Sequence, residues 1–215
     1  MLTAGLSKWR TQWKSQGGRR FLIPEVIQTS TMDCGPAALT ALLNGLGIQA
    51  SYGRLREACQ TDVDGTSIDM LEDLAGRLGL VAEQMIIPSD HILLDVAKNL
   101  PAIVVVRHAS GVPHFVVCWR RDGDYVQLMD PATGRHFQHS ATFLQRLFVH
   151  AQAMPVAAIR KWLGGSGFVR PLTARMRQLD VPRAQEDKLL QDAKSQRSWQ
   201  RWAQLDAAVR MAADL

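Results

Sequence analysis

The sequence predicts an α+β domain over residues 21–155, followed by a helical extension over residues 156–215. Two observations predict this class. Apolar residues recur at helical spacing in the first half of the domain, and strand-like runs separated by turn residues fill its second half. Helices followed by strands are typical of folds that segregate helices from an antiparallel sheet. The length of 215 residues allows one such domain and an appendage.

Composition excludes several classes of protein. Apolar residues make up 47% of the chain and charged residues 21%, which excludes a disordered chain and a collagen. No apolar run approaches the ~20 residues of a membrane span, and no signal peptide is evident. The three cysteines are too few and too scattered for a disulfide framework, so we expect a reducing, cytoplasmic setting.

Charge is distributed unevenly along the chain. Residues 25–130 have a net charge of −7, while residues 1–24 and 131–179 contain basic residues and no acidic ones. Basic flanks suit either a phosphate-bearing surface, such as lipid headgroups, or plain solvent. No nucleic-acid-binding motif is present, so we expect no nucleic-acid partner.

The N-terminal residues 1–20 are predicted to be a basic lead-in, either weakly helical or disordered. In a helix, Trp9 and Trp13 would share one face with the neighbouring basic side chains. Such a face would either lie on a membrane surface or pack on the domain.

The first predicted helix starts near Pro36 and ends at Gly47. Two more helices are expected at 52–58 and 68–78, the latter capped by Thr66 or Ser67. The remaining expected elements are an extended stretch at 24–28, strands at 81–87, 102–107, 114–119 and 125–130, and short helices at 92–99 and 143–147. In the extension, an apolar stripe requires a packing partner; it comprises Trp202, Leu205, Val209 and Ala212.

Cys34 is the residue that carries the most chemical information. It precedes an apolar helix, and the partial positive charge and free N–H groups of a helix N-terminus favour a thiolate. Cys59 and Cys118 are predicted to be structural, with Cys118 in a core on the same strand face as Val116. A lone cysteine at a helix start is also often just a small buried residue.

A nucleophilic cysteine needs a base and an orienting group. His114 opens one predicted strand and Asp130 ends the next, so an antiparallel pairing makes them neighbours. Gln28 is a candidate donor to an oxyanion, together with the Cys34 backbone N–H. Two further histidines, His136 and His139, offer a metal site, but no third ligand is evident.

These residues together resemble a known family. The matching motifs are Gln28, Asp33-Cys34-Gly35-Pro36-Ala37-Ala38-Leu39, Asp64-Gly65-Thr66-Ser67, Leu78-Gly79-Leu80, His114-Phe115-Val116-Val117, Asp130-Pro131 and Gly134. They resemble, over about residues 22–150, the bacteriocin-processing cysteine peptidases, the papain-like domains at the N-terminus of peptidase-containing ABC transporters.

The resemblance implies a papain-like fold and an endopeptidase that cleaves leader peptides after a Gly-Gly pair while a transporter exports the cargo. It implies Cys34 as nucleophile, His114 as general base and acid, Asp130 as orienting group and Gln28 in the oxyanion hole. The implied partners are a precursor peptide with a double-glycine leader and an ABC transporter, fused or separate, at the cytoplasmic face of the membrane. No cofactor is expected for the peptidase domain, with ATP used only by a transporter. A non-cleaving leader-binding module and a papain-like acyltransferase remain alternatives.

One further sequence feature lies in the extension. Gly164-Gly165 is itself a double-glycine pair, preceded by apolar residues at helix-like spacing. It is either a site of self-cleavage or self-inhibition or a helix C-cap rich in glycine, and the C-cap interpretation is favoured. No transmembrane segment and no ATP-binding loop follow residue 155, so the extension is expected to be a linker or a helical tail.

Overall fold

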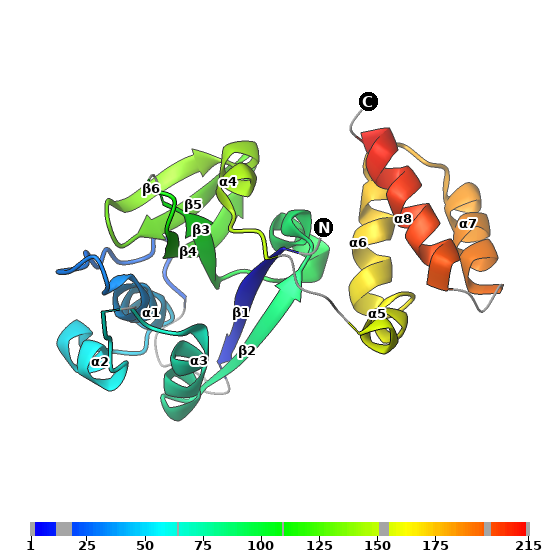
Figure 1. Ribbon diagram of the computed structural model, residues 1–215. Coiled ribbons are helices and arrows are strands. Elements are labelled where there is room, and N and C mark those ends of the chain that lie inside the picture. Colours follow the sequence, from blue (N-terminus) through cyan, green and yellow to red (C-terminus); the bar gives the residue numbers. More distant parts are fainter. Residues whose placement is uncertain are drawn as a thin grey trace. The chain divides into compact units, whose positions relative to one another are not determined.

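A computed structural model describes residues 3–11, 19–63, 65–108, 110–150, 155–195 and 199–213. The chain divides into two units (Figure 1). The first comprises Met1–Leu93 and Asn99–Ala151, and the second comprises Leu94–Lys98 and Gln152–Leu215. The first unit holds the sheet and the candidate site residues, while the second holds a separate group of helices.

The helices of the first unit come before most of its strands. They are α1 (Cys34–Gly45), α2 (Tyr52–Ala58) and α3 (Ile68–Arg77). Nearly every residue of α1 after Cys34 is buried, because the helix is apolar on most sides. The predicted cap of α3 is confirmed, since Ser67 Oγ accepts a hydrogen bond from the Met70 N–H at 3.2 Å.

The strands form one antiparallel sheet of six strands among the described residues, in the order β2-β1-β3-β4-β5-β6. Their bounds are β1 Thr3–Thr11, β2 Leu80–Ile87, β3 Ala102–Arg107, β4 Pro113–Asp122, β5 Tyr125–Asp130 and β6 Gly134–His139. Helix α4 (Ser140–Arg146) follows β6. The predicted α+β class is therefore confirmed, with helices and sheet segregated along the chain.

The N-terminal lead-in differs from its prediction. Residues 3–11 form strand β1, which pairs with β2 on one side and β3 on the other, so a helical or disordered lead-in is wrong for this segment. Pairing partners distant in sequence supply the backbone hydrogen bonds that a local pattern does not reveal. The predicted tryptophan face includes Trp13, which lies outside the described residues.

Two further segments also differ. Residues expected to form a helix at 92–99 instead form two 3₁₀ turns, η1 (Ser89–Leu93) and η2 (Asp95–Ala97), and Lys98 ends the second with a φ of 50°. Strand β6 was not predicted, because its alternation of polar residues gives no apolar signal. The tight turn before it lets the chain reverse, with Gly134 at a φ of 95° that favours glycine.

The sheet separates two apolar cores. Successive residues of a strand face opposite sides, so Ile103 and Val117 pack with α1, while Val104 and Val116 pack with α4. Cys118 lies in the second core with Val116, as predicted, and the buried Cys59 lies in the first. Helix α1 thus packs on the face of the sheet that carries Ile103 of β3 and Val117 of β4.

The second unit contains four described helices with a core of their own. They are α5 (Val156–Trp162), α6 (Ser166–Gln178), α7 (Arg183–Ser195) and α8 (Trp199–Ala213). Phe168, Leu172 and Met176 of α6 pack with Val209 and with the partly buried Trp202 of α8. Most of the predicted apolar stripe of α8 therefore finds its partner inside this unit. None of the described helices of either unit is long and apolar enough to cross a membrane.

The double-glycine pair lies in the turn between α5 and α6. Gly164 has a φ of 80°, and a Cβ at this position would lie 3.1 Å from Trp202 Nε1. Gly165 is the N-cap of α6. Both the backbone conformation and the tryptophan ring require a small residue at position 164, which favours the structural interpretation of the pair.

Gly45 at the end of α1 generates a stability prediction. A Cβ at Gly45 would lie 2.7 Å from the Trp119 ring, which is completely buried, whereas a Cβ at Gly53 of α2 would meet nothing within 4 Å. We expect Gly45→Ala to lower the free energy of unfolding by about 1–3 kcal/mol through overpacking. Gly53→Ala should raise it by about 0.5–1 kcal/mol through helix propensity. Urea titration followed by circular dichroism measures both, and equal effects would contradict the packing argument.

Candidate active site

Cys34 is the first residue of α1, directly after the N-cap Asp33. It is partly exposed, whereas Cys59 and Cys118 are buried. Gly35 lets the start of the helix approach Thr66, since a Cβ at Gly35 would lie 3.0 Å from Thr66 Cβ. Of the three thiols, Cys34 alone therefore combines a helix N-terminus with access for a reagent.

His114 and Asp130 form a buried pair where the start of β4 lies beside the end of β5. The His114 Nε2 and Asp130 Oδ1 atoms are 2.7 Å apart, and both side chains are 6% exposed. Strands β4 and β5 are antiparallel neighbours, so the start of one lies beside the end of the other, as the sequence predicted. Since Nε2 is engaged, Nδ1 is the ring nitrogen that remains for a second partner.

The Cys34 side chain interacts with the His114 ring and favours its protonated form. Burial disfavours the charged imidazolium, but the hydrogen bond with Asp130 and the interaction with the Cys34 thiol outweigh it and raise the pKa of His114 to about 9. The imidazole ring is therefore protonated at neutral pH. The structure thus brings Cys34, His114 and Asp130 together as a row of three interacting side chains.

Asp130 is held by more than His114. Its Oδ1 accepts a hydrogen bond from the Ala132 N–H at 2.9 Å, and Arg146 of α4 lies 3.6 Å from its Oδ2. Burial opposes the carboxylate charge, but the hydrogen bonds from His114 and Ala132 hold the pKa of Asp130 below its ordinary value. Arg146 was missed at the sequence level, because nothing in a predicted helix at 143–147 points toward a residue on β5.

A main-chain hydrogen bond holds Gln28 next to Asp130. The Gln28 N–H donates to the Pro131 carbonyl at 2.9 Å, directly after Asp130. Its Oε1 atom is buried and has no hydrogen-bond partner among the described residues. A half-turn of the carboxamide exchanges Oε1 with Nε2, so the same position can present a donor. A buried carboxamide atom without a hydrogen-bond partner is costly in free energy unless a ligand supplies that partner.

The two histidines considered for a metal have local structural partners. The His136 Nδ1 atom lies 3.2 Å from the Gly134 carbonyl oxygen, and the His139 Nδ1 atom accepts from the Ala141 N–H at the start of α4. Within the part of the chain that the structure describes, no group of three potential metal ligands occurs.

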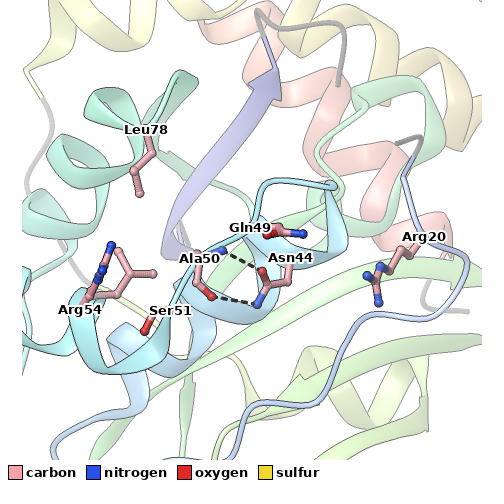
Figure 2. A pocket seen from close by; sticks show the side chains of 8 residues that line it. Arg20, Asn44, Gln49, Ala50, Ser51, Arg54 and Leu78 are labelled. Carbon is pink, nitrogen blue, oxygen red and sulfur yellow. Dashed lines mark hydrogen bonds between the residues drawn. The ribbon is translucent and has the colours of Figure 1, made fainter. Parts of the chain in front are cut away.

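A pocket of about 640 Å³ lies away from this site (Figure 2). It is formed by the end of α1, the start of α2 and the end of α3, and is lined by Arg20, Asn44, Gln49, Ala50, Ser51, Arg54, Leu55 and Leu78. The Asn44 side chain at this pocket makes two hydrogen bonds with the Ala50 main chain. None of the four candidate site residues lines this pocket.

A known protein is similar in sequence to about half of this chain. The Lactococcin-G-processing and transport ATP-binding protein LagD of Lactococcus lactis subsp. lactis is 30% identical over 110 residues, which are 51% of this chain and 16% of that protein. The chain therefore spans a small part of that relative.

Two solved structures share the fold. One is the peptidase domain of Streptococcus ComA, a bi-functional ABC transporter involved in a quorum-sensing pathway. It is 26% identical with a TM-score of 0.51, and the match covers 60% of this chain and 93% of that one. The other is a double glycine motif protease from an AMS/PCAT transporter in complex with the leader peptide, at 22% identity and a TM-score of 0.51, covering 62% of this chain and 89% of that one.

The sequence model of the peptidase C39 family matches residues 23–148, which are more than half of the chain and include Cys34, His114 and Asp130. The chain belongs to the peptidase C39 family, a family of cysteine peptidases.

Proposed function

We propose that this chain is a cysteine endopeptidase that cleaves leader peptides after a Gly-Gly pair. The single observation that carries the proposal is the position of the His114 ring between the Cys34 thiol and the Asp130 carboxylate. This is the order of nucleophile, base and orienting group that thiol peptidases require. A similar fold in a double glycine motif protease supports the choice of cleavage site.

The reaction is amide hydrolysis in two halves. The Cys34 sulfur, as thiolate, attacks the carbonyl carbon of the second glycine, and a C–S bond forms while the carbonyl oxygen becomes an oxyanion. Collapse of this intermediate breaks the C–N bond, and His114 gives its proton to the leaving amine. His114 then takes a proton from water, which attacks the thioester and releases the leader with a new carboxylate.

Two donors are proposed to bind the oxyanion. The Cys34 backbone N–H lies in the first turn of α1, where N–H groups have no acceptor within the helix. The Gln28 carboxamide is the second donor through its Nε2 amide group, and the bond of its main chain to the Pro131 carbonyl holds it next to Asp130. Asp130 keeps the His114 ring oriented through the bond to Nε2.

The proposed partners follow from relatives of this chain. A curated relative is named for processing and transport, so we propose a precursor peptide as substrate and an ABC transporter, fused or separate, as partner, at the cytoplasmic face of the membrane. The nucleophile, the base and the oxyanion donors all come from the chain. We therefore propose that cleavage requires no cofactor and proceeds unchanged in EDTA, with ATP used only by the transporter.

Replacement of the nucleophile tests the proposal directly. Cys34→Ala should lower the cleavage of a double-glycine leader peptide by at least about a thousandfold, because no other group can form the thioester. Cys118→Ala, on the opposite face of the sheet, is the matched control and should retain activity. Product formation is followed by mass spectrometry.

The outcomes separate the alternatives. If Cys34→Ala cleaved the peptide as fast as the unsubstituted protein, Cys34 would not be the nucleophile. A chain that binds the leader peptide without cutting it is a leader-binding module, and transfer of the leader to an added amine in preference to water indicates an acyltransferase.

Removal of the Gln28 carboxamide should reduce transition-state stabilisation. We expect Gln28→Ala to lower kcat by roughly two orders of magnitude with little change in KM, the size typical of a lost oxyanion donor. Gln49→Ala removes the same group from an exposed residue and should leave both parameters unchanged. A Gln28→Ala variant that raises KM alone would show that Gln28 binds substrate rather than the oxyanion.

The pKa of His114 predicts the alkaline limb of activity. The imidazolium persists up to a pKa of about 9, so kcat/KM should fall as the pH rises through about 9 and the proton for the leaving amine is lost. Asp130→Asn removes the carboxylate charge and should move this midpoint down toward the ordinary histidine value of about 6.5. His108→Gln tests the neighbouring ring, whose centroid is 5.5 Å from that of His114, and should leave the midpoint in place. An alkaline limb that does not respond to Asp130→Asn would contradict the assignment.

A further inference from the structure

The loop from Gln28 to Cys34 connects the two proposed oxyanion donors. It contains bends and a turn but no helix or strand, so its shape is not fixed by a backbone ladder. The separation of the two donors therefore depends on how this loop is held. A misplacement of about 1 Å at an oxyanion site can cost roughly a hundredfold in rate.

The buried carboxylate of Asp33 holds the two ends of this loop together. Asp33 is 1% exposed, and its Oδ2 atom accepts a hydrogen bond from the Thr29 hydroxyl at 3.1 Å. Asp33 precedes Cys34 and Thr29 follows Gln28, so this bond joins the neighbours of the two donors. The loop is thereby closed on itself across four residues.

Helix α2 supplies the remaining partners of that carboxylate. The Tyr52 hydroxyl donates to Asp33 Oδ2 at 3.1 Å and accepts from the Thr29 N–H at 3.0 Å. Arg56, one turn further along the same face of α2, places its Nε atom 2.8 Å from Asp33 Oδ2. Tyr52 therefore bonds to both ends of the loop, and Arg56 balances the buried charge.

We propose that Tyr52 is a positioning residue for the oxyanion site, holding Gln28 and the Cys34 N–H at their working separation through Thr29 and Asp33. The inference rests on the proposed function, and it deepens it by assigning a role to helix α2. Tyr52 touches neither the thiol nor the His114 ring in this arrangement, so it acts through its neighbours. Nothing in the sequence around Tyr52 pointed to this role, because the contact spans 19 residues.

The test is the variant Tyr52→Phe, which removes the hydroxyl and keeps the ring. We expect kcat for a double-glycine leader peptide to fall about tenfold while KM stays within about twofold, since substrate binding is untouched. The rate of Cys34 alkylation by iodoacetamide, read by peptide mass spectrometry, should be unchanged. Tyr125→Phe is the matched control, because Tyr125 is exposed and is the other tyrosine of the chain.

A double variant shows whether Tyr52 acts through Gln28. If it does, Tyr52→Phe combined with Gln28→Ala should have the kcat of Gln28→Ala alone within about twofold, whereas independent effects would multiply. Multiplied effects, an unchanged kcat in Tyr52→Phe, or a loss of alkylation that parallels the loss of activity would each overturn the inference.

A second variant tests the inference if Tyr52→Phe lowers the thermal stability of the protein. Thr29→Val removes the hydroxyl of an exposed residue, which bonds to Asp33 and lies 3.2 Å from the Tyr52 hydroxyl. It should also lower kcat without changing KM. Failure of the original chain to cleave the peptide would contradict the proposed function and the inference with it. Cleavage by the original chain together with unaffected Tyr52→Phe and Thr29→Val variants contradicts the inference alone.

Discussion

The burial of helix α1 against strand β4 is the constraint on which the rest of the first unit depends. Its apolar side chains, such as Leu39 and Leu42, are completely buried, and each contributes roughly 1.5–3 kcal/mol. The two elements meet at both ends. Cys34 meets His114 at the start, and Gly45 approaches Trp119 at the end.

The lengths of these two elements match. Eleven steps along α1 and five steps along β4 each advance the chain by roughly 16 Å. The helix therefore cannot slide along the strand without either separating the thiol from the imidazole or driving its backbone into the indole ring. Hydrophobic packing of α1 on the sheet thus sets the positions of Cys34 and His114 at the start of the helix and of strand β4.

Polar support reaches the site from two independent directions. On the sheet side, Asp130 orients His114 and is itself held by Ala132 and Arg146. On the helical side, Asp33 and Tyr52 hold the loop that leads to Cys34. Burying charged groups is costly and contributes little to net stability even when they are paired. The presence of two such groups around one thiol is consistent with a requirement for orientation rather than for stability.

The second unit is organised on a simpler principle. Its core joins α6 and α8 through aromatic and aliphatic contacts, and Arg175 and Arg210 both pair with Asp206 beside that core. The double-glycine pair is part of this packing, since Trp202 lies against Gly164. The turn at Gly164 favours glycine, which accounts for the first residue of a pair that resembles a cleavage motif.

Local sequence patterns determined the helices of the first unit, its central strands and the identity of the four candidate site residues. Helical periodicity, capping residues and turn residues act over a few positions, so α2, β3 and β5 have the bounds that their residues predict. The order of the strands also implied that His114 and Asp130 would be neighbours. The contact of Cys34 with His114 was expected from the resemblance and from the geometry of a helix packed on a sheet.

Only the tertiary structure decided the rest, because those features depend on partners far away in the chain. Strand β1 is defined by its pairing with β2 and β3, and β6 by its pairing with β5, rather than by any apolar pattern of their own. The ion pair of Arg146 with Asp130 and the bond of Tyr52 to Asp33 join separate elements. A one-dimensional pattern records which side chains are available, but long-range packing chooses which of them meet.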